Sequence, residues 1–447
     1  MIEPTKKDSK TGNSTAESQL FPPPIRKVED TGLNLLWLQD HILKLMYFEG
    51  YLSGFRIAEQ ACLPFSGTVD QIMEALKREK LVEVRSTQQM GYGEGAYQYA
   101  ITSSGVVRAR EALDRNQYVG PAPVPLKAYN EAILAQSRGR MHVTSRLMRQ
   151  VLSHLVLSET TFHRLGPAIN SGMSIFLYGP PGDGKTSVAK AVGGLIQSKS
   201  MYIPHALYID GHVIKLFDSV NHQLADSDAH AKNGTGSLEL AGRRDTRWVN
   251  IRRPFIVVGG ELTMSGLDLV FDDVHKFYEA PFQVKANGGI LLIDDFGRQL
   301  IRPRDLLNRW IVPLESRVDY LSLHTGRKLE IPFDVLVIFS TNLPPKDLVD
   351  EAFLRRLRHK IEIGDPSYEE YREIFKRVAS NKNIDYNDQG LAYLLQEWYI
   401  KRNRKLRASH PRDLCDQILD IANYLGEKPE MSREMIDRAA ESYFVEL

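Results

Sequence analysis

The chain has 447 residues, of which 43% are hydrophobic and 25% are charged, a composition typical of a globular protein with two or three domains. Its formal net charge is +1, so no overall field draws it to nucleic acid or to an anionic membrane surface. Its two cysteines, Cys62 and Cys415, have no metal-binding spacing, which argues against a disulfide scaffold and a zinc site.

The first 30 residues are polar, rich in Lys, Ser and Thr, and contain three consecutive prolines at 22–24. Such a stretch cannot bury enough apolar surface to fold, so we expect a flexible tail over residues 1–30. The start lacks the charged and then apolar order of a signal peptide, and no apolar run approaches the roughly 18 residues that span a bilayer. The sequence therefore predicts a cytoplasmic protein without a membrane partner.

Residues 31–118 have the pattern of a small α+β domain, with apolar-periodic helices followed by two β-type runs around a glycine-rich segment and by one more helix. The predicted ranges are 33–47, 56–61 and 68–80 for the first helices, 81–85 and 97–102 for the strands, and 104–116 for the last helix. Three helices and a glycine-turned hairpin resemble a winged helix domain.

A winged helix domain suggests DNA binding through the helix at 68–80, but the charges favour another role. Residues 31–119 contain nine Lys and Arg against ten Asp and Glu. Phosphate neutralisation supplies most non-specific affinity for DNA, and this domain lacks the usual basic footprint. The balance favours protein docking or self-assembly, and DNA contact through residues 31–118 stays open as the alternative.

A proline-dense stretch at 119–125 predicts a stiff, extended linker, which we place at 119–129. It marks the boundary to a second domain, predicted over residues 130–364. Helical patterns at 126–155 and 160–169 lead to a short apolar run at 175–178.

That apolar run is followed by a complete match to the P-loop pattern G-x-x-x-x-G-K-[ST], and then by a helix-forming segment. The glycines let backbone N–H groups surround phosphates at the positive end of the helix. Lys185 adds a charge on the phosphates, and the Thr186 hydroxyl can hold Mg²⁺. The residues predicted to bind the nucleotide are Gly179, Pro180, Pro181, Gly182, Asp183, Gly184, Lys185, Thr186 and Ser187.

Further β-type runs occur at 206–210, 213–217, 255–258, 290–293 and 335–339. Their alternation with helices predicts a parallel sheet with helices on both faces, an α/β fold. Between them, residues 224–250 are polar and charged, and we expect a mobile surface insertion there.

The run at 290–293 ends in Asp294 and Asp295, which is the Walker B pattern. A carboxylate at the carboxyl end of such a strand lies across the crevice from the P-loop. Asp294 is therefore predicted to act with Thr186 in holding Mg²⁺, and Asp295 to polarise the attacking water.

Three further segments occur in the order of the AAA+ ATPases, and together with the P-loop they make residues 130–447 resemble that family. The run at 335–339 continues to Asn342, which resembles sensor 1. The segment with Arg355 and Arg356 resembles the one that carries the arginine finger, and His410-Pro411-Arg412 resembles sensor 2. The resemblance implies catalytic roles for Asn342, Arg355, Arg356 and Arg412, with ATP and Mg²⁺ as ligands.

Helical patterns over residues 365–447 resemble the AAA+ lid, with four helices expected and a capping box formed by Ser367 and Glu370. An arginine finger acts on a neighbour's nucleotide, so the resemblance also implies a homo-oligomeric ring, commonly a hexamer. The basic run at 401–407 is interpreted as a solvated loop.

Two details resemble one branch of the family. Ala-Asn-Gly-Gly at 286–289 is similar to the MoxR-like ATPases and the bacterial enhancer-binding activators, and a hairpin pattern at 320–331 resembles the pre-sensor 1 β-hairpin. The chain departs from the family at Asp295, where Glu is usual. The shorter side chain predicts slow turnover or help from another acid, for which Glu261 is a candidate. Two adjacent aromatics, Phe277 and Tyr278, in a predicted loop at 275–281 are a candidate for gripping a polypeptide, with a place in the core as the alternative.

The leading hypothesis is a cytoplasmic, MoxR-like AAA+ ATPase that couples ATP hydrolysis to the remodelling of a protein client, with a winged helix-like adaptor domain. One alternative is a DNA-associated ATPase that uses residues 31–118 for loading or regulation. Another is a switch that assembles with ATP and hydrolyses it slowly, which Asp295 supports.

Overall fold

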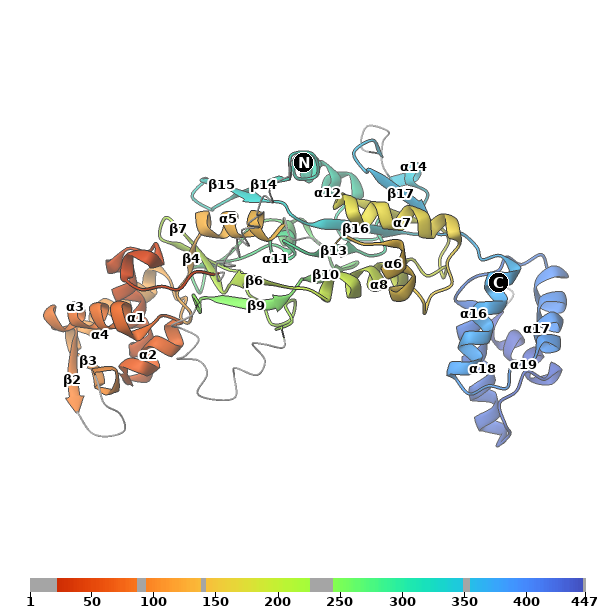
Figure 1. Cartoon of the computed structure of the whole chain (residues 1–447), viewed down its shortest axis with the longest axis horizontal. Coiled ribbons are helices and arrows are strands. Elements are labelled where there is room, and N and C mark those ends of the chain that lie inside the picture. Colours follow the sequence, from red (N-terminus) through yellow and green to blue (C-terminus); the bar gives the residue numbers. More distant parts are fainter. Residues whose placement is uncertain (1–21, 87–93, 138–141, 226–243, 349–353, 445–447) are drawn as a thin grey trace, which may run out of the picture. The chain divides into compact units, whose positions relative to one another are not determined.

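The computed structural model describes residues 22–86, 94–137, 142–225, 244–348 and 354–444 (Figure 1). Its internal contacts divide the chain into two units. The first comprises Met1–Leu113, Val119–Ala122 and His230–Trp248, and the second comprises Asp114–Tyr118, Pro123–Ala229 and Val249–Leu447. Within the described ranges, no helix has the length and the apolar character needed to cross a membrane.

In the first unit, helices pack on a small antiparallel sheet with strand order β1-β3-β2. Helix α1 begins after Asn34, whose side chain accepts a hydrogen bond from the Leu36 N–H, and it buries Leu38 and Ile42 completely. The elements are α1 Leu35–Glu49, β1 Tyr51–Ser53, α2 Gly54–Ala61, α3 Asp70–Arg78, β2 Val82–Ser86, β3 Gln98–Ile101 and α4 Ser103–Arg115, with short turns η1 Val28–Thr31, η2 Phe65–Val69 and η3 Glu94–Ala96.

Each helix and strand expected between residues 31 and 118 is present, and β1 is an addition that the sequence pattern did not predict. The expected tail is shorter than residues 1–30, because Ile25 and Val28 are buried in the first unit; residues 1–21 lie outside the described ranges. Apolar side chains beyond the prolines therefore extend the folded unit toward the N-terminus.

Part of the stretch predicted as a stiff, extended linker is packed, and two of its residues form a short strand. The Ala122 N–H donates to the Ala61 carbonyl at 2.8 Å, and β4 Val124–Pro125 pairs with β7 Ala206–Ile209. Ala122 and Val124 are each only 1% exposed. The backbone of Ala122 has its partner in the first unit, and β4 has its partner in the second. The prolines fix an extended path of the chain in this stretch.

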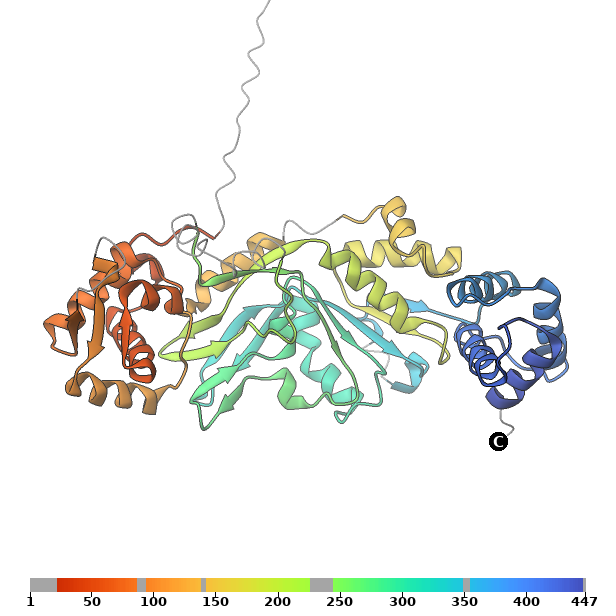
Figure 2. The same cartoon turned by 90° about the horizontal axis from the view of Figure 1, so that it is seen from below.

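The centre of the second unit is a parallel sheet with strand order β10-β13-β16-β5-β17. Successive side chains of its strands point to opposite faces, so one face packs on α6, α7 and α8 and the other on α11, α12 and α13 (Figure 2). This confirms the predicted parallel sheet with helices on both faces. The strands are β5 Ile175–Tyr178, β10 Phe255–Val258, β13 Ile290–Ile293, β16 Leu336–Thr341 and β17 His359–Glu362, and the helices are α6 Ser145–Val151, α7 Glu159–Ser171, α8 Lys185–Gln197, α11 Phe282–Lys285, α12 Pro303–Arg309 and α13 Ile311–Ser316.

A second sheet has the order β11-β12-β8-β7-β4, and it contains two of the runs that we expected in the central sheet. Those runs, β7 Ala206–Ile209 and β8 His212–Lys215, are joined by two residues and pair antiparallel. So short a connection cannot cross over to a parallel neighbour, which explains the error. The other strands are β11 Val270–Asp272 and β12 Phe277–Glu279; helix α5 Leu126–Ser137 packs nearby, and η5 Met264–Leu267 precedes β11.

The expected loop at 275–281 is also wrong, because it contains strand β12 and its Tyr278 is 1% exposed in the core. The predicted insertion at 224–250 is folded at its carboxyl end, where β9 Trp248–Arg252 pairs with β6 Ser200–Pro204; residues 226–243 lie outside the described ranges. The hairpin predicted at 320–331 is confirmed, with β14 Val318–Ser322 paired to β15 Lys328–Pro332.

The C-terminal residues 367–444 fold as the expected helices around their own core. The predicted capping box is present: Ser367 Oγ accepts from the Glu370 N–H at 3.2 Å, and Glu370 accepts from the Ser367 N–H at 2.8 Å. The helices are α16 Tyr368–Asn381, α17 Asp388–Leu394 with its π-helical continuation η6 Leu395–Ile400, α18 His410–Leu425 and α19 Arg433–Tyr443, and the short α14 Pro345–Leu348 precedes them.

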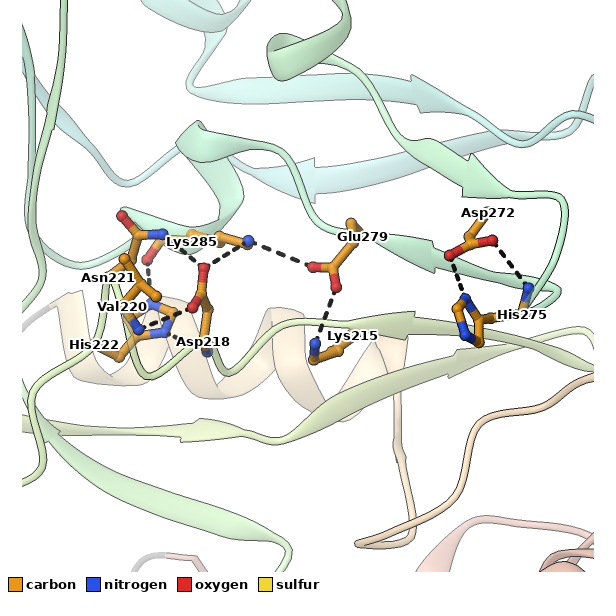
Figure 3. A network of polar contacts seen from close by, with 9 residues as sticks. All are labelled: Lys215, Asp218, Val220, Asn221, His222, Asp272, His275, Glu279 and Lys285. Carbon is orange, nitrogen blue, oxygen red and sulfur yellow. Dashed lines mark hydrogen bonds and ion pairs between the residues drawn. The ribbon is translucent and has the colours of Figure 1, made fainter.

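A polar network fastens the segment after β8 to β12 and α11 (Figure 3). Lys285 Nζ lies 3.0 Å from Asp218 Oδ2 and 3.4 Å from Glu279 Oε2, and Lys215 Nζ lies 3.1 Å from the other Glu279 oxygen. His222 Nδ1 accepts from the Asp218 N–H, so its Nε2 carries the proton and donates to the Lys285 carbonyl at 2.9 Å. The network holds this segment without contributing to the cavity described next.

Candidate nucleotide-binding site

The P-loop pattern forms the turn between β5 and α8, as predicted. Gly179 has a φ of 147°, and a Cβ there would lie 2.0 Å from the Ile363 carbonyl oxygen, so the approach of the chain after β17 requires glycine. Lys185 Nζ donates to the carbonyls of Gly179 at 3.0 Å and Pro180 at 2.7 Å. The loop therefore places a nearly buried ammonium group at the start of a helix of 13 residues.

Burial lowers the pKa of the Lys185 ammonium, and the carboxylates of Asp183, Asp295 and Asp294 oppose this effect. A desolvated cation at the N-terminus of a helix, where backbone N–H groups lack intrahelical partners, binds anions such as phosphate strongly. The sequence predicted the turn between β5 and α8 because all of its residues lie in one continuous segment.

Thr186 and Asp294 come together from α8 and the end of β13. Thr186 Oγ1 lies 3.0 Å from each carboxylate oxygen of Asp294. One hydroxyl and one carboxylate beside a phosphate site are the oxygen ligands that Mg²⁺ takes while it keeps several waters. The donor set therefore fits Mg²⁺, as predicted for these two residues.

Asp295 is next in the chain and has a φ of 49°, a left-handed conformation uncommon for non-glycine residues. Asn342 Nδ2 lies 3.4 Å from its Oδ1, so the end of β16 and the end of β13 meet here. The Phe296 N–H donates to the Ser340 carbonyl at 2.7 Å, which fixes the turn. Glu261 instead accepts from the Gly259 N–H at 2.8 Å and is not among the residues that line the cavity.

Lys185, Thr186, Asp295 and Asn342 line one cavity of about 510 Å³, and Asp294, which is not among its lining residues, contacts Thr186. Of the predicted site residues, Asp295, Asn342 and Arg412 line it together with most of the P-loop. Arg412 lies in the first turn of α18, and its Nε donates to Asp413 Oδ1 at 3.0 Å. The full lining comprises His154, Leu155, Val156, Leu157, Pro181, Gly182, Asp183, Gly184, Lys185, Thr186, Ser187, Val188, Asp295, Ser340, Asn342, Ile374, Arg377, Val378, Asn381, Ala408, Ser409 and Arg412.

Sequence reasoning missed the half of the cavity that lies away from the P-loop. Residues 154–157 line it from before α7, and Ile374, Arg377 and Val378 line it from α16. The only available signal was the apolar stretch at 155–157 within a polar neighbourhood. Arg377 Nη1 also donates to the Ser153 carbonyl at 2.6 Å, which connects these two segments.

The two predicted arginine-finger residues do not line the cavity of their own chain. Arg356 Nε instead lies 2.5 Å from Glu315 Oε1 on α13, and Arg355 is exposed. An arginine finger that acts on a neighbouring subunit would also lie away from the cavity of its own chain, so this placement does not test the prediction.

The basic run at 401–407 is more constrained than a solvated loop. The guanidinium groups of Arg402 and Arg404 lie 4.1 and 5.8 Å from the centre of the Trp398 ring. Arg407 makes an ion pair with Asp183 of the P-loop at 3.0 Å. The interpretation of this run as solvated is therefore wrong for the partly buried Arg404 and Arg407, while Arg402 is exposed as expected.

Comparison with known proteins gives a family match to a "Domain of unknown function (DUF8689)" over residues 367–442, which are the C-terminal helices. No curated protein matches the chain. Among solved structures, NtrX from Brucella abortus in complex with ADP is 17% identical at a TM-score of 0.38, over 74% of this chain and 65% of that one. The RuvB Holliday junction branch migration motor of Thermotoga maritima is 15% identical at a TM-score of 0.36, over 64% and 70%. Scores of this size add nothing to the fold that the strand order itself establishes.

Proposed function

We propose that the chain is an AAA+ ATPase that binds ATP with Mg²⁺ and hydrolyses it. The observation that carries the proposal is the convergence of Lys185, Thr186, Asp294, Asp295 and Asn342 at the carboxyl ends of three parallel strands, with Arg412 across the same cavity. Ligands of open α/β sheets bind at this end of the strands. The cavity has a volume of about 510 Å³, which is in the range of small-molecule sites.

In this proposal each residue has a separate task. Lys185 and the N–H groups of the loop bind the phosphates, and Thr186 and Asp294 hold Mg²⁺, which supplies charge neutralisation when bound. Asp295 accepts a proton from the attacking water while Asn342 orients it, and Arg412 contacts the terminal phosphate from α18. Leu155, Leu157 and Ile374 supply apolar surface for the base at the other end of the cavity.

We propose that hydrolysis drives the remodelling of a protein client, with the first unit as a winged helix-like adaptor. The exposed residues of α3 include Glu74 beside Lys77 and Arg78, and Arg108 is paired with Asp40 and Glu79. This mixed surface suits a protein better than a phosphate backbone.

The test is steady-state ATP hydrolysis, measured with and without duplex and single-stranded DNA over a salt titration. The proposal predicts hydrolysis that DNA does not stimulate. Salt-sensitive stimulation by DNA would support the DNA-associated alternative, and absence of hydrolysis with intact ATP binding would support the assembly switch.

A further inference from the structure

Asp183 places a negative charge inside a loop that is otherwise built for anions, and its side chain is fully buried. It stands between Gly182 and Gly184, two residues before Lys185. A buried carboxylate close to bound phosphates would weaken their binding unless a cation compensated it. The compensating cation comes from the other side of the cavity.

Arg407 supplies that charge from the segment that leads into α18. Its Nη1 lies 3.0 Å from Asp183 Oδ2 and also contacts Asp365. The Ala408 N–H donates to the second oxygen, Asp183 Oδ1, at 3.2 Å. Both oxygens of Asp183 are therefore engaged by consecutive residues that lie 224 and 225 positions away.

The same segment contacts the P-loop backbone directly. A Cβ at Gly182 would lie 2.5 Å from Ser409 Oγ, so Ser409 packs against the Gly182 backbone, whose φ of 85° also favours glycine. Arg412 is three residues further along, in the first turn of α18, and it lines the cavity. The residues that contact Asp183 therefore lie just before α18, whose first turn contains Arg412.

We propose that Asp183 and Arg407 form an ion pair that closes the C-terminal helices over bound nucleotide and positions Arg412. This inference rests on the proposed function, because it assigns to the pair a part in binding ATP. Asp183 and Arg407 act as positioning residues through α18. Asp365 lies where β17 leads into α16, so Arg407 connects the P-loop to the segment that begins the C-terminal helices.

A double-mutant cycle with a fluorescent ATP analogue tests the pair through the equilibrium dissociation constant and the dissociation rate. Asp183→Asn and Arg407→Met each remove one charge and keep most of the side-chain volume. Each should weaken binding about tenfold, mainly through faster dissociation. The double variant should also be about tenfold weaker, because both changes remove the same interaction.

Two variants separate charge from packing and from general effects on the helices. Arg407→Lys keeps the charge beside Asp183 and should stay within about threefold of the wild type. Arg372→Ala removes an exposed ion pair with Asp388 on α16 and α17 and should leave the affinity unchanged. Thermal unfolding of each variant confirms that it is folded.

Hydrogen exchange in nucleotide-free protein tests the contact without ATP. The Ala408 amide should exchange faster in Asp183→Ala than in the wild type, because it loses its acceptor. Wild-type protection of Ala408 in that variant, unchanged affinity in Arg407→Met, or a double variant about a hundredfold weaker would each overturn the inference. Failure of the wild type to bind ATP would instead overturn the proposed function. Hydrogen exchange of the Ala408 amide would in that case still report on the contact with Asp183.

Discussion

Asp295 is the residue on which the proposed chemistry depends. Asp295 lies in the turn after β13, where it has a φ of 49° and its Oδ1 lies 3.4 Å from Asn342 Nδ2. A left-handed conformation costs a non-glycine residue about 1 kcal/mol or more, and such strain concentrates at functional sites. The conformation is compatible with Asp because its short side chain can form local hydrogen bonds.

Asp295→Asn should lower the hydrolysis rate by about a hundredfold or more, because it removes the proton acceptor. Affinity for ATP should stay near that of the wild type, since the P-loop is unchanged. Rapid-quench measurement of a single turnover separates the chemical step from binding. Glu261→Gln is the control. A normal hydrolysis rate in Asp295→Asn together with a lost rate in Glu261→Gln would show that Glu261, and not Asp295, is the proton acceptor.

At the scale of elements, the first unit includes a piece of chain from far along the sequence. Arg247 is 3% exposed, forms an ion pair with Asp245 at 2.8 Å, and donates to the Thr31 carbonyl at 2.9 Å. Thr246 Oγ1 donates to the Cys62 carbonyl at 2.8 Å. A domain made of residues 31–118 alone, as expected from the sequence, would therefore lack residues 245–247, which belong to the interior of the first unit.

Arg247→Ala should destabilise the first unit by about 3–5 kcal/mol, because it leaves the buried Asp245 carboxylate without the guanidinium that neutralises it. Hydrogen exchange of α1 and α2 reports on this unit separately from the rest of the chain. Arg56→Ala, which removes an exposed pair with Glu59 in the same unit, should have a small effect. Equal protection of α1 in wild type and Arg247→Ala would contradict the assignment of residues 245–247 to this unit.

The network around Lys285 predicts acid sensitivity of the second unit (Figure 3). Burial alone would raise the pKa of Asp218, but the Val220 N–H, Asn221 and Lys285 outweigh it and lower the pKa to about 2. A lowered carboxylate pKa stabilises the fold above its ordinary value of 3.8, and this contribution is lost as pH falls from there toward 2. Burial also lowers the pKa of His222, so its neutral form stabilises the fold above pH 6.5 and that contribution declines below it.

Asp218→Asn should cost about 2 kcal/mol at pH 7, because a charged hydrogen-bond partner of Lys285 is lost. The loss should shrink as pH falls below 3.8, where the wild type loses the same contribution. Chemical unfolding at several pH values measures it. Asp272→Asn, at the exposed pair with His275, is the matched control, and its free energy of unfolding should change little. An equal loss in both variants would contradict a particular contribution of the contact between Asp218 and Lys285 to stability.

Local patterns predicted the elements that are defined within a few residues of each other. The P-loop, the capping box at Ser367 and the hairpin at 320–331 all depend on neighbours in sequence. The pairing of β7 with β8, the burial of Tyr278 and the contact of Arg407 with Asp183 depend on distant partners. Apolar or basic runs are compatible with several such partners, so the sequence alone did not select among them.

At the scale of the whole molecule, the predicted arginine finger concerns a contact between subunits. If Arg355 or Arg356 acts on the nucleotide of another subunit, hydrolysis requires assembly. Alanine at both positions should then lower turnover by about a thousandfold while ATP affinity stays unchanged. Wild-type specific activity should also rise with protein concentration through the assembly range.

Arg438→Ala removes an exposed pair with Glu434 on α19 and serves as the control for charge loss. Analytical ultracentrifugation at the assay concentrations gives the oligomer present in each case. Specific activity that is independent of concentration, or a double variant with normal turnover, would remove the case for catalysis between subunits.

The central claim is that Lys185, Thr186 and Asp294 bind ATP together with Mg²⁺, and calorimetric titration of the full chain with ATP tests it most directly. We predict saturable binding of one ATP per chain that Mg²⁺ strengthens, that Lys185→Ala abolishes, and that loses its Mg²⁺ dependence in Thr186→Ala and Asp294→Ala. Binding that is absent in the wild type, or that is unchanged in Lys185→Ala, would contradict the account.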